Sequence, residues 1–143
     1  MAGSRSWPGL RGRRNECERL SGLVAPVLAG HSQVLMLRGQ AGIGKTALLE
    51  FLVDRAAGCR VARAAGVESE MELANACLHQ LCSPYLDRVG RLPAPQQDAL
   101  ATAFGLRTGV APDRFLVGLA TLSLLADAGG NEPLVCLIDD AQW

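Results

Sequence analysis

Apolar residues occur along this chain in two patterns, which predict strands and helices in alternation. Uninterrupted runs at 34–37 and 134–138 predict strands buried on both faces of a parallel sheet, the first of them spanning residues 33–38. A short segment at 60–64, in which Val61 is the only large apolar residue, is predicted as another strand. Stripes spaced by three or four residues predict helices that begin near 15, 44, 70, 96 and 112. Strands alternating with helices favour the α/β class with parallel crossover connections.

Several residues predict where these helices begin and end. Asn15 with Glu18 three residues later fits a capping box, and Gly30 is expected to end this first helix. The apolar stripe continues past Pro26, which predicts a kink and not a stop. Pro112 is well placed as the first residue of the last helix, which runs to about Ala128. The inner stripe of that helix is predicted to be Phe115, Leu116, Leu119, Leu122 and Leu125.

The strongest chemical signal lies between the first strand and the second helix. Residues 39–46 read GQAGIGKT and match the phosphate-binding pattern G-x-x-x-x-G-K-[ST]. Glycines allow a tight turn whose N–H groups face an anion, and the following helix adds its positive N-terminus. The chain's only lysine, Lys45, would reach the β- and γ-phosphates, and the Thr46 hydroxyl would bind Mg²⁺. The alternative is a glycine-rich turn without a ligand, but strand, loop and helix follow in the required order. The predicted nucleotide-binding residues here are Gly39, Gln40, Ala41, Gly42, Ile43, Gly44, Lys45 and Thr46.

A second signal ends the chain, where five apolar residues precede Asp139 and Asp140. A buried parallel strand would present a carboxylate at its C-terminal edge, where Asp139 can hold Mg²⁺, usually through water, opposite Thr46. Asp140 could then orient or deprotonate an attacking water, which makes it and Lys45 the catalytic candidates. Alone, such a pattern more often marks a buried strand followed by a polar turn. Behind a phosphate-binding loop, the Walker B interpretation is favoured.

Composition limits the function classes further. At 143 residues, with 49% hydrophobic and 20% charged residues, the chain has the make-up of one globular domain. Its formal net charge of zero gives no electrostatic case for nucleic-acid or membrane binding, and no apolar run approaches a membrane span of about 20 residues. Arg13-Arg14 could open an export signal, but Glu16 and Glu18 follow at once without an apolar region. A cytoplasmic location is therefore expected.

The five cysteines are odd in number and contain no C-x-x-C pair. Cys77, His79 and Cys82 lie close in sequence, as metal ligands can. On a helix, however, positions 77 and 79 point about 200° apart. The cysteines are therefore predicted to be small buried hydrophobic residues in a reducing compartment.

Both motifs and their surroundings resemble the N-terminal ATPase region of large LuxR-type transcriptional regulators, which are signal-transduction (STAND) ATPases allied to the AAA+ group. The matching segments are LRGRRNECERL at 10–20, LRGQAGIGKTALLEFLVDRA at 37–56, ARAAGVESEMELANACLHQLCSPYLDR at 62–88 and PLVCLIDDAQW at 133–143. The resemblance implies a P-loop NTPase three-layer sandwich with a parallel sheet over residues 13–143. Gly3, Pro8, Gly9 and Gly12 predict a flexible tail at 1–12 before it. The resemblance implies ATP and Mg²⁺ as cofactors. It also makes Gly12-Arg13 the family's Gly-Arg element on the adenine side, so Arg13 joins the nucleotide-binding candidates.

Two departures from the family shape the functional expectation. Many relatives carry Glu where this chain has Asp140, one methylene shorter, which fits a slow, switch-like ATPase. Family members also continue with further sheet strands, a helical sensor region and a DNA-binding helix-turn-helix, so the chain is expected to be an N-terminal fragment with an incomplete sheet. The expected function is an ATP/Mg-binding switch module of a LuxR-family regulator, with slow or absent hydrolysis, no membrane partner, self-association left open, and DNA contacted only through the missing domain.

Two alternatives stay open at this stage. One is a standalone P-loop ATPase or a kinase-like enzyme, although Arg88, Arg91 and Arg107 form no compelling acceptor site. The other is an interaction fragment that no longer binds nucleotide. Nucleotide-dependent stabilisation and phosphate release separate these three functions.

Overall fold

The computed structural model describes residues 10–70 and 75–141. It divides the chain into two compact units, Met1–Cys59 and Arg60–Trp143. Three parts of the predictions lie outside the described residues: positions 1–9 of the tail, 71–74 of the helix expected from residue 70, and the last two residues.

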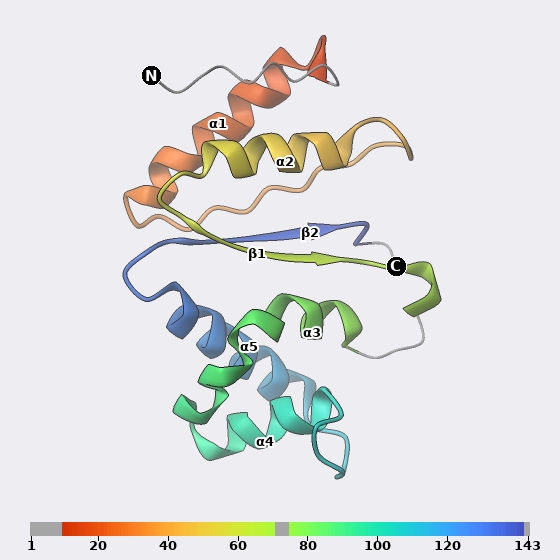
Figure 1. Cartoon of the computed structure of the whole chain (residues 1–143), viewed down its shortest axis with the longest axis vertical. Coiled ribbons are helices and arrows are strands. Elements are labelled where there is room, and N and C mark those ends of the chain that lie inside the picture. The colour runs from red at the N-terminus through yellow and green to blue at the C-terminus, as the bar shows by residue number, and fades with distance from the viewer. Residues whose placement is uncertain (1–9, 71–74, 142–143) are drawn as a thin grey trace. The chain divides into compact units, whose positions relative to one another are not determined.

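The first unit contains two helices, α1 (Arg14–Leu28) and α2 (Lys45–Arg55), which pack side by side (Figure 1). Leu20 of α1 is buried, as are Leu48, Phe51 and Leu52 of α2. The chain leaves α1 through Gly30, which lies in the left-handed region with φ +88° and donates its N–H to Val27. Both helices and the glycine stop were predicted from the sequence.

The predicted start of α1 is wrong by two residues. Arg13 occupies the N-cap, and Asn15 lies inside the helix without a side-chain capping bond. Glu18, the other half of the predicted box, instead pairs with Arg14 at 2.9 Å. The i,i+4 spacing of this pair places both side chains on one helix face, where the ion pair forms in place of the cap. Pro26 does not stop the helix, which continues to Leu28 as expected.

The predicted strand at 33–38 is not formed. Residues 31–40 adopt neither helix nor strand, and the apolar run is exposed, with 95% of Val34 and 69% of Met36 accessible to solvent. A strand requires hydrogen-bond partners on a neighbouring strand, and within the described residues the only paired strands are β1 and β2. An apolar run predicts the tendency to be buried in a sheet, but the pairing itself depends on distant segments.

The second unit contains a parallel pair of strands, β1 (Arg60–Ala65) and β2 (Leu134–Asp139). Both strands and their parallel direction were predicted, but the predicted burial of β2 on both faces is wrong, since Ile138 is 47% exposed. Their register runs from Arg60 opposite Leu134 to Ala65 opposite Asp139. The connection between them consists of short 3₁₀ segments and three helices: η2 (Glu68–Glu70), α3 (Ala76–Cys82), η3 (Ser83–Arg91), α4 (Ala94–Ala103) and α5 (Arg114–Gly129). Within this unit α3 packs on β1, α5 contacts β2, and α4 packs on α5 (Figure 1).

Small side chains allow the helices to approach the sheet and one another. Ala62 and Ala64 form the buried face of β1 and pack with Leu81 of α3. A second cluster joins the helices and consists of Cys82, Leu92, Ala99, Leu100, Val117, Ala120 and Leu124. The core is thus almost entirely aliphatic, in keeping with the chain's low aromatic content of 4%.

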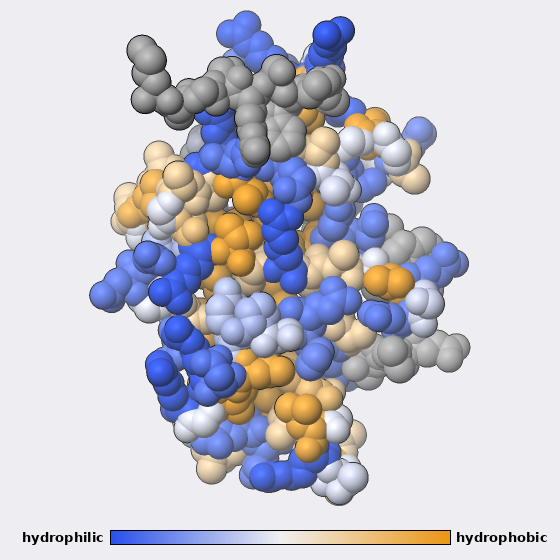
Figure 2. Space-filling model, in the orientation of Figure 1, coloured by the Kyte–Doolittle hydropathy of each residue, from blue (hydrophilic) through white to orange (hydrophobic). Residues whose placement is uncertain are grey.

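The face that helix α5 buries overlaps only in part with the predicted one, since Leu116 and Leu125 of the predicted stripe pack partly buried against the core clusters. Phe115 and Leu122 of the predicted inner stripe are 78% and 68% exposed. The buried residues of α5 are Val117, Ala120, Thr121, Leu124, Ala128 and Gly129. Because α5 carries apolar residues nearly all round, the spacing fits two faces, and the face with alanines and glycine packs closer. Apolar side chains accordingly reach the surface in several places, and Figure 2 shows them in orange between blue polar groups.

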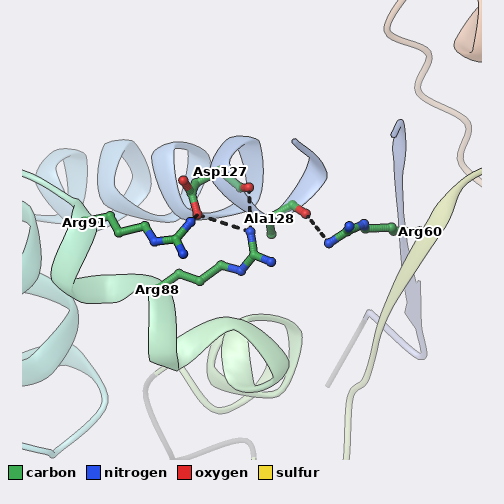
Figure 3. A network of polar contacts seen from close by, with 5 residues as sticks. All are labelled: Arg60, Arg88, Arg91, Asp127 and Ala128. Atoms are coloured by element: carbon green, nitrogen blue, oxygen red, sulfur yellow. Dashed lines mark hydrogen bonds and ion pairs between the residues drawn. The ribbon is translucent and has the colours of Figure 1, made fainter. Parts of the chain in front are cut away.

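The two ends of α5 are fixed by side chains from outside the helix. At the start, the Asp113 carboxylate is the N-cap and accepts from Phe115 N–H at 2.6 Å, so the helix begins after Asp113 and not at Pro112. At the end, Arg88 donates to the Asp127 carbonyl at 2.9 Å and Arg60 to the Ala128 carbonyl at 3.0 Å (Figure 3). These cations satisfy terminal carbonyls and complement the negative end of the helix dipole.

The Asp127 carboxylate completes this network. Arg88 and Arg91 each approach its Oδ2 at 3.4 Å, as Figure 3 shows. Arg107, the third arginine of the region considered for an acceptor site, pairs with Asp98. All three arginines are therefore engaged in contacts that hold the helices.

The prediction that the cysteines are buried holds for some of them and not for others. Cys82 is fully buried, whereas Cys136 is exposed, contrary to the prediction, because it lies on β2 away from the buried Leu137. Burial, with the neighbouring Cys136, raises the pKa of the Cys82 thiol to about 11. Along the described ranges, no helix is long and apolar enough to cross a membrane.

Candidate phosphate-binding site

The loop at 39–44 turns tightly into α2 because two glycines adopt a backbone that side chains disfavour. Gly42 has φ +76° and Gly44 has φ +93°, both in the left-handed region. For residues with a Cβ this conformation costs about 1–2 kcal/mol of conformational energy, so glycine is favoured at these two positions. The local backbone therefore explains the motif glycine at 44, and it also explains Gly42, which stands at a variable position of the motif.

Lys45 folds back over the loop. Its ammonium donates to the carbonyl oxygens of Gly39 and Gln40, each at 3.1 Å. A Cβ added at Gly39 would lie 2.9 Å from Cγ2 of Ile43, so the beginning and end of the loop approach closely. The ammonium of the chain's single lysine therefore lies against the tight turn, where its charge can meet an anion.

The N-terminus of α2 adds to this positive site. Gly44 is the N-cap, has no side chain to cap the helix, and the first turn contains no acidic residue. The first N–H groups of a helix have no intrahelical acceptor, and the helix dipole favours negative charge there. The donors, the lysine and the glycine turn together fit a phosphate group.

Arg13 reaches the same loop from the start of α1. Its Nη2 donates to the Ile43 carbonyl oxygen at 2.9 Å, and its Nη1 donates to Glu16 Oε1 at 2.9 Å. The hydrogen bond from Arg13 lowers the pKa of the Glu16 carboxyl, which stays ionised. The structure therefore brings Arg13 together with the loop, although the two are thirty residues apart in the sequence.

Glu16 is a site residue that the sequence reasoning missed. It was considered only as a charge that argues against an export signal. The signal that could have identified it is its spacing of three from Arg13, which on a helix places the two side chains together.

The two candidate aspartates lie in the second unit, at the C-terminal end of β2 as predicted. Gly66 donates its N–H to the Asp139 carbonyl at 2.9 Å, which extends the pairing of the strands to this end. The Asp139 carboxylate accepts from Asp140 N–H at 3.0 Å, and Asp140 has φ +48°. Thr46 belongs to the first unit, where it is the second residue of α2. Coordination of one Mg²⁺ by Thr46 and Asp139 together therefore stays a prediction.

The described residues contain no group of three or more His, Cys, Asp and Glu side chains that could hold a metal by itself. His79, between the two cysteines of the metal alternative, packs edge-on against the Phe104 ring with centroids 5.0 Å apart. Its role in the structure is a packing contact within the helical region.

A family model described as AAA ATPase domain matches residues 9–143, which include both the loop and the two aspartates. No curated protein and no solved structure matches the chain.

Proposed function

Since this chain belongs to the AAA ATPase domain family, we propose that it is an ATP-binding module in which residues 39–46 hold the nucleotide phosphates. The observation that carries the proposal is the position of Lys45. Its ammonium already lies across the loop carbonyls of Gly39 and Gln40, at the N-terminus of a helix with no acid in its first turn. On binding, this ammonium would exchange those carbonyls for phosphate oxygens.

The remaining residues have distinct proposed roles. The Thr46 hydroxyl and the Asp139 carboxylate would hold Mg²⁺, which when bound neutralises charge on the phosphate oxygens. Asp140 would orient an attacking water. Its side chain is one methylene shorter than the Glu of many relatives, which favours slow hydrolysis and therefore a switch.

We place this module in a three-layer P-loop fold within a cytoplasmic regulator of the LuxR type. The support is the resemblance over residues 10–20 and 62–88, which lie outside both nucleotide motifs. Direct DNA binding by this chain is not part of the proposal, since its formal net charge is zero. A mobility-shift assay with and without Mg·ATP should show no retarded DNA, and retention at physiological salt would contradict this assignment.

A kinase-like activity is disfavoured by the contacts of the arginines that would serve an acceptor site. Arg88 and Arg91 bind Asp127, and Arg107 binds Asp98. Phosphate release from ATP that is unchanged by added acceptors would agree with the switch function, whereas acceptor phosphorylation would support the kinase.

The decisive experiment is thermal unfolding with and without Mg·ATP. At ligand one hundredfold above Kd, binding stabilises by about 2.7 kcal/mol, enough to raise the midpoint by several degrees. Lys45→Met should abolish this rise. Arg38→Ala is the matched control, since it removes an exposed positive charge just before the loop and should keep the rise. No rise in the unaltered chain, or an equal rise in Lys45→Met, would refute the proposal.

A further inference from the structure

Arg13, at the start of α1, binds both its own helix and the backbone of the nucleotide-binding loop. One terminal nitrogen of its guanidinium binds the Ile43 carbonyl oxygen and the other binds Glu16, both at 2.9 Å. The side chain of Arg13 is 29% exposed, and its bond to Glu16 is partly shielded from solvent, whereas its bond to Ile43 lies at the surface. Arg13 is also the N-cap residue of α1, which places its backbone at a fixed point of that helix.

The bond to Ile43 has a consequence for the next residue. In a trans peptide the carbonyl oxygen and the following N–H point in opposite directions. With the Ile43 oxygen directed toward Arg13, the Gly44 N–H points away from Arg13. Gly44 is the N-cap of α2, so this N–H belongs to the set of donors at the helix start.

The loop needs such a restraint because glycines make it permissive. Gly42 and Gly44 both have positive φ and little barrier to other backbone angles. If the peptide between Ile43 and Gly44 turned over, a carbonyl oxygen would replace an N–H and would repel an anion. A charged hydrogen bond from Arg13 holds one orientation, and Glu16 holds Arg13.

We propose that Arg13 and Glu16 are positioning residues that fix the Ile43–Gly44 peptide, so that the Gly44 N–H is presented to the nucleotide phosphate. This inference rests on the proposed function, and it assigns Arg13 to the phosphate loop and not to the adenine. Both terminal nitrogens of Arg13 bind groups of the protein, which fits a residue that acts on the phosphate through Gly44.

The test compares two ligands that differ only in carrying a nucleoside, Mg·tripolyphosphate and Mg·ATP, by calorimetric titration of the full chain. Arg13→Ala should weaken both by the same factor, about tenfold to a hundredfold, because a charged hydrogen bond is lost. Glu16→Gln and Arg13→Lys should each give a smaller, equal loss for both ligands. Lysine keeps the charge but cannot bridge two acceptors as a fork.

Arg14→Ala is the matched control, because Arg14 forms the same kind of pair with Glu18 at 2.9 Å on the exposed side of α1. It should leave both affinities unchanged. If Arg13→Ala weakens ATP and leaves tripolyphosphate unaffected, Arg13 contacts the nucleoside and the inference is overturned. Equal losses in Arg13→Ala and Arg14→Ala would likewise overturn it, since a general charge effect would then suffice.

A second readout separates this inference from the proposed function. In the ligand-free chain, the amide signal of Gly44 in a glycine-labelled NMR spectrum should move or broaden in Arg13→Ala and stay in place in Arg14→Ala. If the unaltered chain binds neither ligand, the proposed function fails, and the Gly44 signal still decides the positioning role. An unchanged Gly44 signal in Arg13→Ala would overturn that role.

Discussion

Replacing one of two leucines on α5 tests which face of this helix forms the core. Leu124 is fully buried in the cluster that joins α3, α4 and α5, whereas Leu122, two positions earlier, is 68% exposed. Leu124→Ala should destabilise the chain by about 3–5 kcal/mol, the transfer of a buried leucine plus the cavity left behind. Leu122→Ala removes a side chain of which only about a third is buried. Its cost of about 0.6 kcal/mol is partly offset by the helix propensity of alanine.

The assay is urea unfolding of the full chain followed by helical circular dichroism. With a slope of about 1–3 kcal/mol per molar urea, Leu124→Ala should lower the midpoint by more than about 1 M, and Leu122→Ala by a few tenths. The two substitutions are chemically identical and lie on one helix, so each controls for the other. If Leu122→Ala costs as much as Leu124→Ala, the stripe expected from the spacing is the packed face, and the assignment of the core is refuted.

Three further predictions concern the second unit. Arg88→Ala should destabilise by about 1–3 kcal/mol in urea unfolding because it strips the carbonyl and carboxylate of Asp127, while Arg107→Ala, at an exposed pair, should change stability by less than about 0.5 kcal/mol. Asp113→Ala should cost about 1 kcal/mol and speed amide exchange in the first turn of α5, whereas Asp113→Asn should keep most of the cap. Stability should fall between pH 9 and 11, because the unfolded Cys82 thiol ionises near 9.0 while the folded thiol, with its pKa raised to about 11, stays protonated. Cys82→Ala should flatten that part of the profile measured by urea midpoints.

Each of these has a clear contrary result. Equal losses of stability in Arg88→Ala and Arg107→Ala would show that Arg88 at the end of α5 stabilises the chain no more than an arginine in an exposed ion pair. If Asp113→Asn lowers the stability as much as Asp113→Ala, the charge of Asp113, and not its cap hydrogen bond, stabilises the helix. An unchanged alkaline slope in Cys82→Ala would assign the slope to other groups.

Local features were well predicted from the sequence. The tight turn at 39–44, the helix after it, the strand predicted at 60–64 and the strand that ends at Asp139 all follow from neighbouring residues: glycine and lysine at fixed spacing, or a short segment next to a turn. The two glycines with positive φ show why, since the backbone of the loop itself demands them.

Features that depend on distant segments were predicted less well. The run at 34–37 has the composition of a buried strand, yet strand formation requires a partner that no local pattern specifies. On α5, leucines surround the helix, so the packed face is chosen by the small residues that let α4 approach, Ala120 among them. The hydrogen bond from Arg13 to Ile43 could not be predicted from the sequence either, because the two residues are thirty positions apart and meet only on folding.

The parallel pairing of β1 with β2 also bears on the order of folding. Arg60 pairs with Leu134, so forming the sheet closes a long loop, and we expect it to follow the helices between the strands, whose contacts are nearer in sequence. During synthesis β1 would therefore emerge early and wait with its edge unpaired. Its composition suits that wait: Arg60 and Arg63 bring charge, and its alanines offer little apolar surface to another chain. The same small, charged strand that fits under α3 in the folded chain thereby resists aggregation before its partner arrives.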